Sequence, residues 1–188
     1  MFVILDNVLP EPIFKRFHGL VCDNQHFNFG AVQTALPTDE VKSFATEPSS
    51  EWERQFFSLA LVTALSKMNL EIDKLLRTRF GILHRDIKQI VNTPHVDNPF
   101  EEHYVGLFYV NDTDGTTKIW EETHTDWGNK ARYLTLDDVK LKEKVPPKGN
   151  RMVLFEGKHF HSSTLPMQTQ LRYTINYNFT CKPIVTEE

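Results

Sequence analysis

Cysteine is scarce in this chain, which contains only Cys22 and Cys181. The two lie near opposite ends and show no Cys-X-X-Cys spacing, so the sequence offers neither a disulfide framework nor a zinc knuckle. Long apolar runs are missing too, because no stretch reaches the roughly 18 apolar residues of a membrane-spanning helix. The apolar start, residues 1–5, is short and lacks a basic region, so we expect a first strand rather than a signal peptide. These absences predict a soluble, cytoplasmic protein with no membrane partner.

An excess of positive charge is also lacking, since 21 Lys and Arg face 25 Asp and Glu, for a net charge of -4. Nonspecific nucleic-acid binding rests on many Lys and Arg contacts with phosphates, so this balance argues against a nucleic-acid partner. The chain does have 40% hydrophobic residues, including 14 Phe, which is typical of a globular protein. A length of 188 residues is enough to bury a core, and we expect one domain over residues 1–188.

Two helices are predicted in the N-terminal part of the chain. Residues 10–21 carry apolar side chains at helical spacing. A second helix is expected to begin after Ser50, which stands three residues before Glu53 in a capping-box arrangement. We expect these helices to form a support over about residues 10–78, with a loop at residues 28–50 between them.

From about residue 80 the apolar pattern changes from helical to alternating. This change predicts an α+β chain whose helices pack on one face of an antiparallel sheet. Eight or so short strands suit a jelly roll, with its core over about residues 80–180. Turn signals at residues 121–150 predict an insertion of loops. The predicted strands are residues 3–9, 82–91, 103–110, 117–121, 132–136, 151–155, 158–163 and 171–180.

A His-X-Asp pair and a later histidine are candidate metal ligands. Residues i and i+2 of an extended strand point the same way, so His95 and Asp97 can approach one ion together, although an isolated pair of this kind is more often a surface turn. A buried strand, a glycine turn and a second strand at residues 150–163 then deliver His161. His159 would share its face, so either histidine could be the third ligand. Two imidazoles and one carboxylate form the facial triad of non-haem Fe(II) oxygenases.

A strictly alternating strand follows these candidates. Arg172, Thr174, Asn176 and Asn178 share one face, and aromatic or aliphatic side chains share the other. Taken alone, the polar face would be expected to meet water. Alternatively it lines the inside of a barrel, where Arg172 forms a charge-assisted pair with a small dicarboxylate and Thr174 adds a hydroxyl. The order His-X-Asp, His, Arg-X-Thr along the chain favours the second interpretation.

Four segments carry a family resemblance over roughly residues 80–180. They are His95-Val-Asp-Asn-Pro99, Phe108-Tyr-Val-Asn111 followed by Asp114-Gly115, Asn150-Arg-Met-Val-Leu-Phe-Glu-Gly157 leading into His161, and Arg172-Tyr-Thr-Ile175. In this order they resemble the 2-oxoglutarate- and Fe(II)-dependent dioxygenases of the prolyl-hydroxylase-like branch. The resemblance implies a double-stranded β-helix in which iron is held by His95, Asp97 and His161. It also implies that 2-oxoglutarate is bound by Arg172, Tyr109 and Thr174.

The same resemblance implies an activity. The enzyme would couple oxidative decarboxylation of 2-oxoglutarate to hydroxylation of a C–H bond, with dioxygen as a substrate and ascorbate as an additional reductant. Its substrate would be a prolyl or other amino-acid side chain of a peptide or protein, or a small molecule. AlkB-type demethylases carry a second arginine six residues after the first; here that position is Asn178, which argues against nucleic acid.

Two other classes of function share these residues. A jelly-roll module could bind a metal or another ligand without redox chemistry, because a fold alone does not specify an activity. A zinc or manganese hydrolase could use the same three ligands. The Arg-X-Thr strand favours the oxygenase, because neither alternative needs a carboxylate anchor beside the metal. The sequence leaves the prime substrate and the oligomeric state open.

Overall fold

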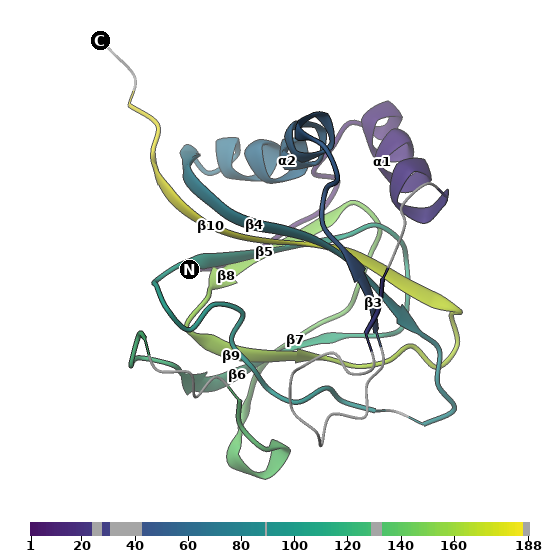
Figure 1. The fold of residues 1–188 in the computed structure, drawn as a ribbon, viewed down its shortest axis with the longest axis vertical. Helices are drawn as coiled ribbons and strands as arrows, with labels where there is room; N and C mark the ends of the chain where they lie inside the picture. The colour runs from purple at the N-terminus through teal and green to yellow at the C-terminus, as the bar shows by residue number, and fades with distance from the viewer. Residues whose placement is uncertain (24–27, 31–42, 89, 129–132, 186–188) are drawn as a thin grey trace.

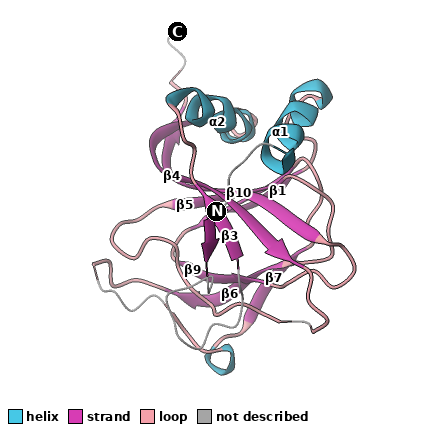
Figure 2. Ribbon diagram, turned by 45° about the vertical axis from the view of Figure 1, so that its right-hand side comes forward, coloured by secondary structure: helices cyan, strands magenta, loops and turns pink. Residues whose placement is uncertain are grey.

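Two antiparallel sheets face each other, and two helices lie on the outer side of the larger sheet (Figures 1 and 2). The structure is a computed structural model that describes residues 1–23, 28–30, 43–88, 90–128 and 133–185. The helices are α1 (Glu11–Asp23) and α2 (Glu51–Ser66). The strands are β1 (Phe2–Leu5), β2 (Asn28–Gly30), β3 (Ser43–Thr46), β4 (Leu70–His84), β5 (Tyr104–Tyr109), β6 (Thr117–Thr123), β7 (Leu141–Val145), β8 (Arg151–Glu156), β9 (His159–Ser163) and β10 (Leu171–Pro183).

The larger sheet has seven strands in the order β1-β8-β5-β10-β4-β3-β2, and the smaller has the order β7-β6-β9. This arrangement confirms the predicted α+β jelly roll with N-terminal helices packed on one sheet. No helix in the described part of the chain is both long enough and apolar enough to cross a membrane.

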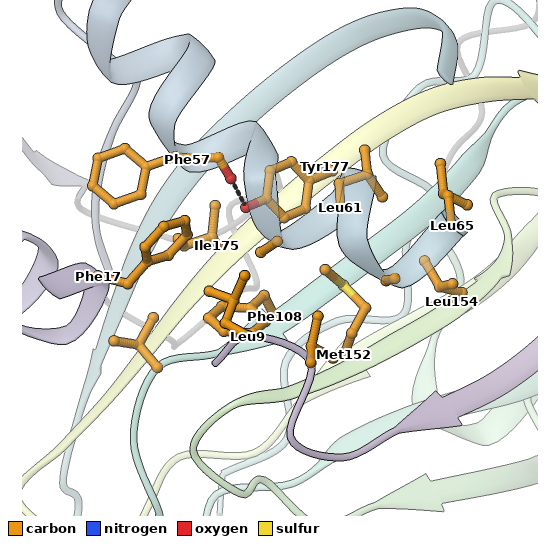
Figure 3. Close-up of a cluster of buried hydrophobic side chains, with 14 of the residues drawn as sticks. Leu9, Phe17, Phe57, Leu61, Leu65, Phe108, Met152, Leu154, Ile175 and Tyr177 are labelled. Atoms are coloured by element: carbon orange, nitrogen blue, oxygen red, sulfur yellow. Dashed lines mark hydrogen bonds between the residues drawn. The ribbon is translucent and has the colours of Figure 1, made fainter. Parts of the chain in front are cut away.

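The main core lies between the helices and the larger sheet (Figure 3). Ile175, Tyr177 and Phe179 of β10 are buried there, as the alternating pattern predicted. The hydroxyl of Tyr177 donates a hydrogen bond to the backbone carbonyl oxygen of Phe57 on α2, at 2.6 Å. Because successive strand residues point to opposite faces, burying this face under the helices turns Arg172 and its polar neighbours toward the space between the sheets.

Helix α2 begins where the capping signal placed it. Ser50 has extended backbone angles, and its side chain accepts a hydrogen bond from the Glu53 amide at 3.2 Å. The Glu53 carboxylate in turn accepts from the Ser49 amide at 2.6 Å. These contacts satisfy amide groups that have no partner inside the helix.

The predicted strand at residues 82–91 is wrong, because β4 runs from Leu70 to His84. The helical support was expected to continue to residue 78, but Asn69 takes a left-handed backbone conformation, φ 58°, and ends it. The long β4 pairs with β10 through two register shifts, between Asn178 and Phe179 and between Thr180 and Cys181. Bulges of this kind interrupt the regular alternation of apolar and polar residues from which a strand is predicted.

Three further predictions need correction. Residues 133–136 do not form a strand, and residue 132 lies outside the described residues. Tyr133 makes one isolated bridge, with His95, and a 3-10 turn follows at Leu136–Asp138. The expected loop at 28–50 includes β2 and β3, although residues 31–42 lie outside the described residues. The expected insertion at 121–150 includes β7, whose mostly exposed, charged sequence suits the edge of the smaller sheet.

Candidate metal centre

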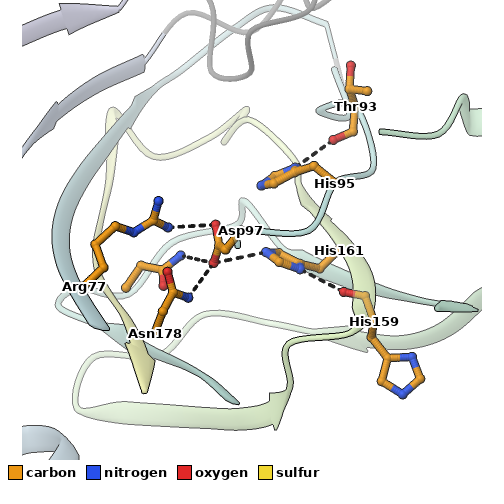
Figure 4. A network of polar contacts seen from close by, with 8 residues as sticks. Arg77, Thr93, His95, Asp97, His159, His161 and Asn178 are labelled. Carbon is orange, nitrogen blue, oxygen red and sulfur yellow. Dashed lines mark hydrogen bonds and ion pairs between the residues drawn. The ribbon is translucent and has the colours of Figure 1, made fainter. Parts of the chain in front are cut away.

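His95, Asp97 and His161 converge between the two sheets (Figure 4). One ligand atom from each lies within 4.8 Å of the other two. The backbones of His95 and His161 form a pair of hydrogen bonds, with N to O distances of 3.0 and 2.9 Å, which fixes the segment before β5 against β9. The imidazole centroids are 4.7 Å apart, and His161 Nε2 lies 3.6 Å from Asp97 Oδ2. The three residues are therefore close enough to share one ion.

Both imidazoles are held by backbone carbonyl groups. His95 Nδ1 lies 2.9 Å from the Thr93 carbonyl oxygen, and His161 Nδ1 lies 3.1 Å from that of His159. A carbonyl oxygen accepts only, so each Nδ1 carries the proton, and each neutral ring has its lone pair on Nε2. Metal-binding histidines usually have this second contact. His161 Nε2 is buried and has no hydrogen-bond partner among the described residues, so the donor set fits a metal ion.

Asp97 is buried and surrounded by donors. Arg77 Nη2 donates to its Oδ1 at 2.9 Å, and the side-chain amides of Asn176 and Asn178 each donate to its Oδ2 at 3.0 Å. Burial alone would raise the pKa of Asp97, but the Arg77 charge and the nearby His161 hold that pKa well below its usual range. Asp97 is thus an ionised carboxylate, the form that binds metal.

His159 does not join the three residues. Its Nδ1 lies 3.2 Å from the Trp120 carbonyl oxygen and its Nε2 lies 3.1 Å from Lys142 Nζ. Figure 4 shows the ring turned away from Asp97. His161 rather than His159 therefore completes the cluster, and the ladder between β6 and β9 shifts register between the residues opposite these two histidines.

Arg172 lies in the same pocket as His95 and His161, with its side chain only 3% exposed. Its Nη2 donates to Thr117 Oγ1 at 2.8 Å, and the buried Tyr109 hydroxyl donates to the same oxygen at 2.6 Å. Burial lowers the pKa of Arg172 and raises that of Tyr109. Arg172 Nε has no hydrogen-bond partner in the described part of the chain. A buried cation without a carboxylate partner is costly, so this guanidinium is suited to an anionic ligand.

Thr174 lines this pocket as well, next to Gly81 on β4. A Cβ atom at Gly81 would lie 3.3 Å from Thr174 Oγ1, so the glycine leaves room for the hydroxyl. The face of β10 that begins at Arg172 therefore lines the barrel interior, and the alternative that it faces water is wrong.

The sequence did not identify Thr117 or Arg77 as site residues. Thr117 is one of many threonines, and only its position on β6, opposite Tyr109 and Arg172, distinguishes it. Arg77 lies in a segment predicted to be helical, and it reaches Asp97 because β4 pairs with β10 at Asn178.

No protein-family model matches the sequence, and the curated proteins contain no match. Solved structures do match. A prolyl hydroxylase from Trichoplax adhaerens, in complex with a hypoxia inducible factor oxygen degradation domain peptide fragment, is 13% identical with a TM-score of 0.63, covering 95% of this chain and 82% of that one. The non-heme alpha ketoglutarate dependent epimerase SnoN from nogalamycin biosynthesis is 11% identical with a TM-score of 0.67, covering 97% and 80%.

HygX from Streptomyces hygroscopicus, with nickel, 2-oxoglutarate and hygromycin B bound, is 12% identical with a TM-score of 0.60, covering 97% of this chain and 82% of that one. The TM-scores and coverages establish the fold, and sequence identities this low leave the reaction undetermined. The resemblance found in the sequence is thus confirmed as a likeness of fold: this chain has the double-stranded β-helix of the 2-oxoglutarate- and Fe(II)-dependent dioxygenases, prolyl hydroxylases among them, and carries a His-X-Asp…His set within it.

Proposed function

We propose that this chain is a 2-oxoglutarate-dependent Fe(II) oxygenase that hydroxylates an unactivated C–H bond. One observation carries the proposal: a buried guanidinium, that of Arg172, shares a single pocket with two of three converging metal-ligand side chains. A structural module has no need of such a cation, and a hydrolase needs the metal ligands but no carboxylate anchor beside them. An oxygenase that uses a dicarboxylate needs both.

In this proposal iron is held by His95, Asp97 and His161. The carbonyl contacts at Nδ1 leave Nε2 of both imidazoles as the ligand atom, and the Arg77 contact keeps the carboxylate ionised. Three protein ligands leave open positions on an octahedral ion, as dioxygen chemistry requires. Acid should release the metal, because protonated imidazoles cannot bind it.

2-Oxoglutarate would bind with its keto-acid end toward the metal and its distal carboxylate against Arg172. Thr117 Oγ1 accepts hydrogen bonds from Arg172 and Tyr109, so its own hydroxyl proton can be donated to that carboxylate. Thr174 would add a second hydroxyl from the neighbouring wall. These buried residues would bind and orient the cosubstrate by charge-assisted hydrogen bonds.

When bound, iron and 2-oxoglutarate supply the oxidising chemistry: dioxygen is consumed, 2-oxoglutarate loses carbon dioxide to give succinate, and one oxygen atom enters the substrate C–H bond. The chain would act as a single domain whose residues position the reactants. The prolyl hydroxylases among the matching structures support hydroxylation. One matching structure holds a peptide fragment and another, HygX, holds hygromycin B, which supports a peptide or a small molecule as the substrate. Ascorbate would serve to maintain reduced iron.

The test is an anaerobic titration of metal-free protein with Fe(II) and 2-oxoglutarate, followed by the weak visible charge-transfer band of the chelate. The wild type should develop the band, and Asp97→Ala and His161→Ala should not. His18→Ala is the matched control, since His18 is an exposed residue of α1. His159→Ala should also retain the band. Iron retained by His161→Ala but lost from His159→Ala would transfer the ligand role to His159.

Arg172→Ala should develop the band only at higher 2-oxoglutarate concentrations. Loss of one charge-assisted partner in a confined site costs a few kcal/mol, about one to three orders of magnitude in affinity. Unchanged 2-oxoglutarate affinity would remove Arg172 from the site. A well-folded wild-type protein that binds Fe(II) but shows no chelate band would contradict the proposed function.

A further inference from the structure

A second arginine, Arg79, lines the pocket that contains His95, His161 and Arg172. It lies on β4, directly across the sheet from Asn176 on β10. Nothing in the proposed metal or 2-oxoglutarate sites uses it. Within the described residues the Arg79 side chain forms no ion pair or hydrogen bond, whereas Arg77, two residues before it, is paired with Asp97. The pocket therefore has a guanidinium with no carboxylate in direct contact beside the candidate metal centre.

The charged groups around the candidate metal centre leave an excess of positive charge at Arg79. Within the described residues, Asp97 is the one carboxylate of the candidate metal centre, and its negative charge would be shared between Arg77 and a metal ion. Burial and the Arg77 charge lower the pKa of Arg79, and the more favourable fields of Asp97 and Glu47 only partly offset them. A pocket with surplus positive charge concentrates anions, so an anionic substrate is favoured there.

Asn176 adds a second recognition group beside Arg79. Its Nδ2 donates to Asp97 at 3.0 Å, which fixes the amide so that Oδ1 is the remaining polar atom. Asn176 Oδ1 is buried and has no hydrogen-bond partner among the described residues, and the side chain lines the pocket. An oxygen acceptor attracts an N–H group and repels an oxyanion. A carboxylate on Arg79 with an N–H group toward Asn176 satisfies both side chains, which a phosphate would not.

Position separates this pair from the cosubstrate anchor. Asn176 follows Arg172 by four residues along β10, which at a rise of about 3.3 Å per residue is roughly 13 Å. Arg79 therefore enters the pocket from a backbone position well separated from that of the cosubstrate anchor. Phe44 and Leu107 line the same pocket and offer apolar surface for a carbon skeleton.

We propose that Arg79 and Asn176 bind the prime substrate, and that this substrate presents an α-carboxylate with a neighbouring N–H group, as a free amino acid or the C-terminal residue of a peptide does. The inference rests on the proposed function and names its substrate class. Arg79 is thus the specificity residue of the site, and Arg172 the cosubstrate residue.

The first experiment measures succinate release by the Fe(II)-loaded wild type with 2-oxoglutarate and dioxygen. The probes are the twenty standard amino acids, each as the free acid, as the N-acetyl acid and as the α-carboxamide. At least one acid should stimulate release above the rate without substrate, and its carboxamide should stimulate less than a tenth as much. Stimulation by the free acid alone assigns a free amino acid, and stimulation by the N-acetyl acid assigns a peptide C-terminus.

The second experiment assigns the preference to Arg79. Arg79→Gln should raise the KM for the stimulating acid about 10- to 100-fold, as expected for loss of one charge-assisted partner, and should abolish the preference for acid over carboxamide. Arg79→Lys, which retains the charge but not the planar fork, should recover part of both. Arg85→Gln is the matched control at an exposed arginine outside the pocket, and it should match the wild type.

Three results would overturn the inference: equal stimulation by acid and carboxamide, stimulation by none of the acids, or a rise in the 2-oxoglutarate KM rather than the substrate KM in Arg79→Gln. The last would place Arg79 on the metal-binding end of 2-oxoglutarate. Failure of the proposed function is distinguishable, because the wild type would then lack the chelate band and release no succinate without added substrate.

Discussion

Replacing Arg77 by leucine tests whether the charge beside Asp97 belongs to the metal centre or only to the fold. Arg77 Nη2 lies 2.9 Å from Asp97 Oδ1, and the two side chains are 28% and 7% exposed. Removing one partner of a fully buried ion pair costs about 3–5 kcal/mol, because the other charge is left uncompensated. The cost here should be smaller, since Arg77 is partly solvated and Asn176 and Asn178 still donate to Asp97.

We therefore expect Arg77→Leu to lower the free energy of unfolding of the metal-free protein by about 2 kcal/mol. At about 2–4 °C per kcal/mol for a chain of this size, Tm should fall by roughly 4–8 °C. Saturating Ni(II), which is redox-inactive here, supplies a positive partner for Asp97. The Tm deficit should then shrink to less than half. Thermal unfolding with and without Ni(II) measures both values, with Arg85→Leu as the matched exposed control.

A double-mutant cycle isolates the pair. If Arg77 acts through Asp97, Arg77→Leu should cost little in an Asp97→Asn background, and the coupling energy should exceed about 1 kcal/mol. Two results would refute the reasoning: a coupling energy near zero, or a Tm deficit of equal size with and without Ni(II). Either would mean that Arg77 stabilises β4 independently of the carboxylate.

Three further predictions concern the surroundings of the site. Asp114 accepts hydrogen bonds from the amides of residues 167–169, and these outweigh the effect of burial and lower the pKa of its carboxyl group. The stability that Asp114 contributes is therefore present above the usual carboxyl pKa of about 4 and is lost as the pH falls toward the lower pKa of the folded state. The Tm difference between wild type and Asp114→Asn should narrow in acid, and a constant difference would contradict this account. A Cβ atom at Gly115 would lie 2.8 Å from the Thr164 carbonyl oxygen and 3.3 Å from Arg172 Cδ. Gly115→Ala should therefore lower the free energy of unfolding by about 1–3 kcal/mol and raise the KM for 2-oxoglutarate. A loss of stability with an unchanged KM would show that Gly115 does not affect the cosubstrate site. Tyr177→Phe removes the buried hydrogen bond to the α2 backbone, so it should lower the free energy of unfolding in denaturant by about 1–2 kcal/mol. The affinity for Ni(II) should not change, and a reduced affinity would show that the helical layer acts on the metal centre.

The sequence predicted the parts of the fold in which local pattern and tertiary environment agree. β10 alternates strictly because one face packs under helices and the other lines the barrel, and α2 begins at a capping residue whose contacts are local. β4 could not be predicted in this way. Its pairing with β10 contains two register shifts, and its polar residues turn toward the site, where Arg77 contacts Asp97 and Arg79 lines the pocket. A buried polar face looks like an exposed one in sequence, so the hydrophobic period gave the wrong boundaries.

The residues of the candidate site also fall into two groups, those that the sequence can pair and those that it cannot. Residues that follow one another at short spacing, such as His95 and Asp97, can be paired from sequence because two residues on one segment reach one ion. Residues that meet only through sheet order cannot be paired by spacing: His161 and Arg172 were assigned through the family resemblance, and Arg77 was missed. Arg77 reaches Asp97 because β4 pairs with β10 and places Arg77 opposite Asn178, which donates to the same carboxylate. The charge beside the carboxylate is thus supplied from the neighbouring strand, and the proposed substrate pair likewise joins Arg79 of β4 to Asn176 of β10 across the same ladder.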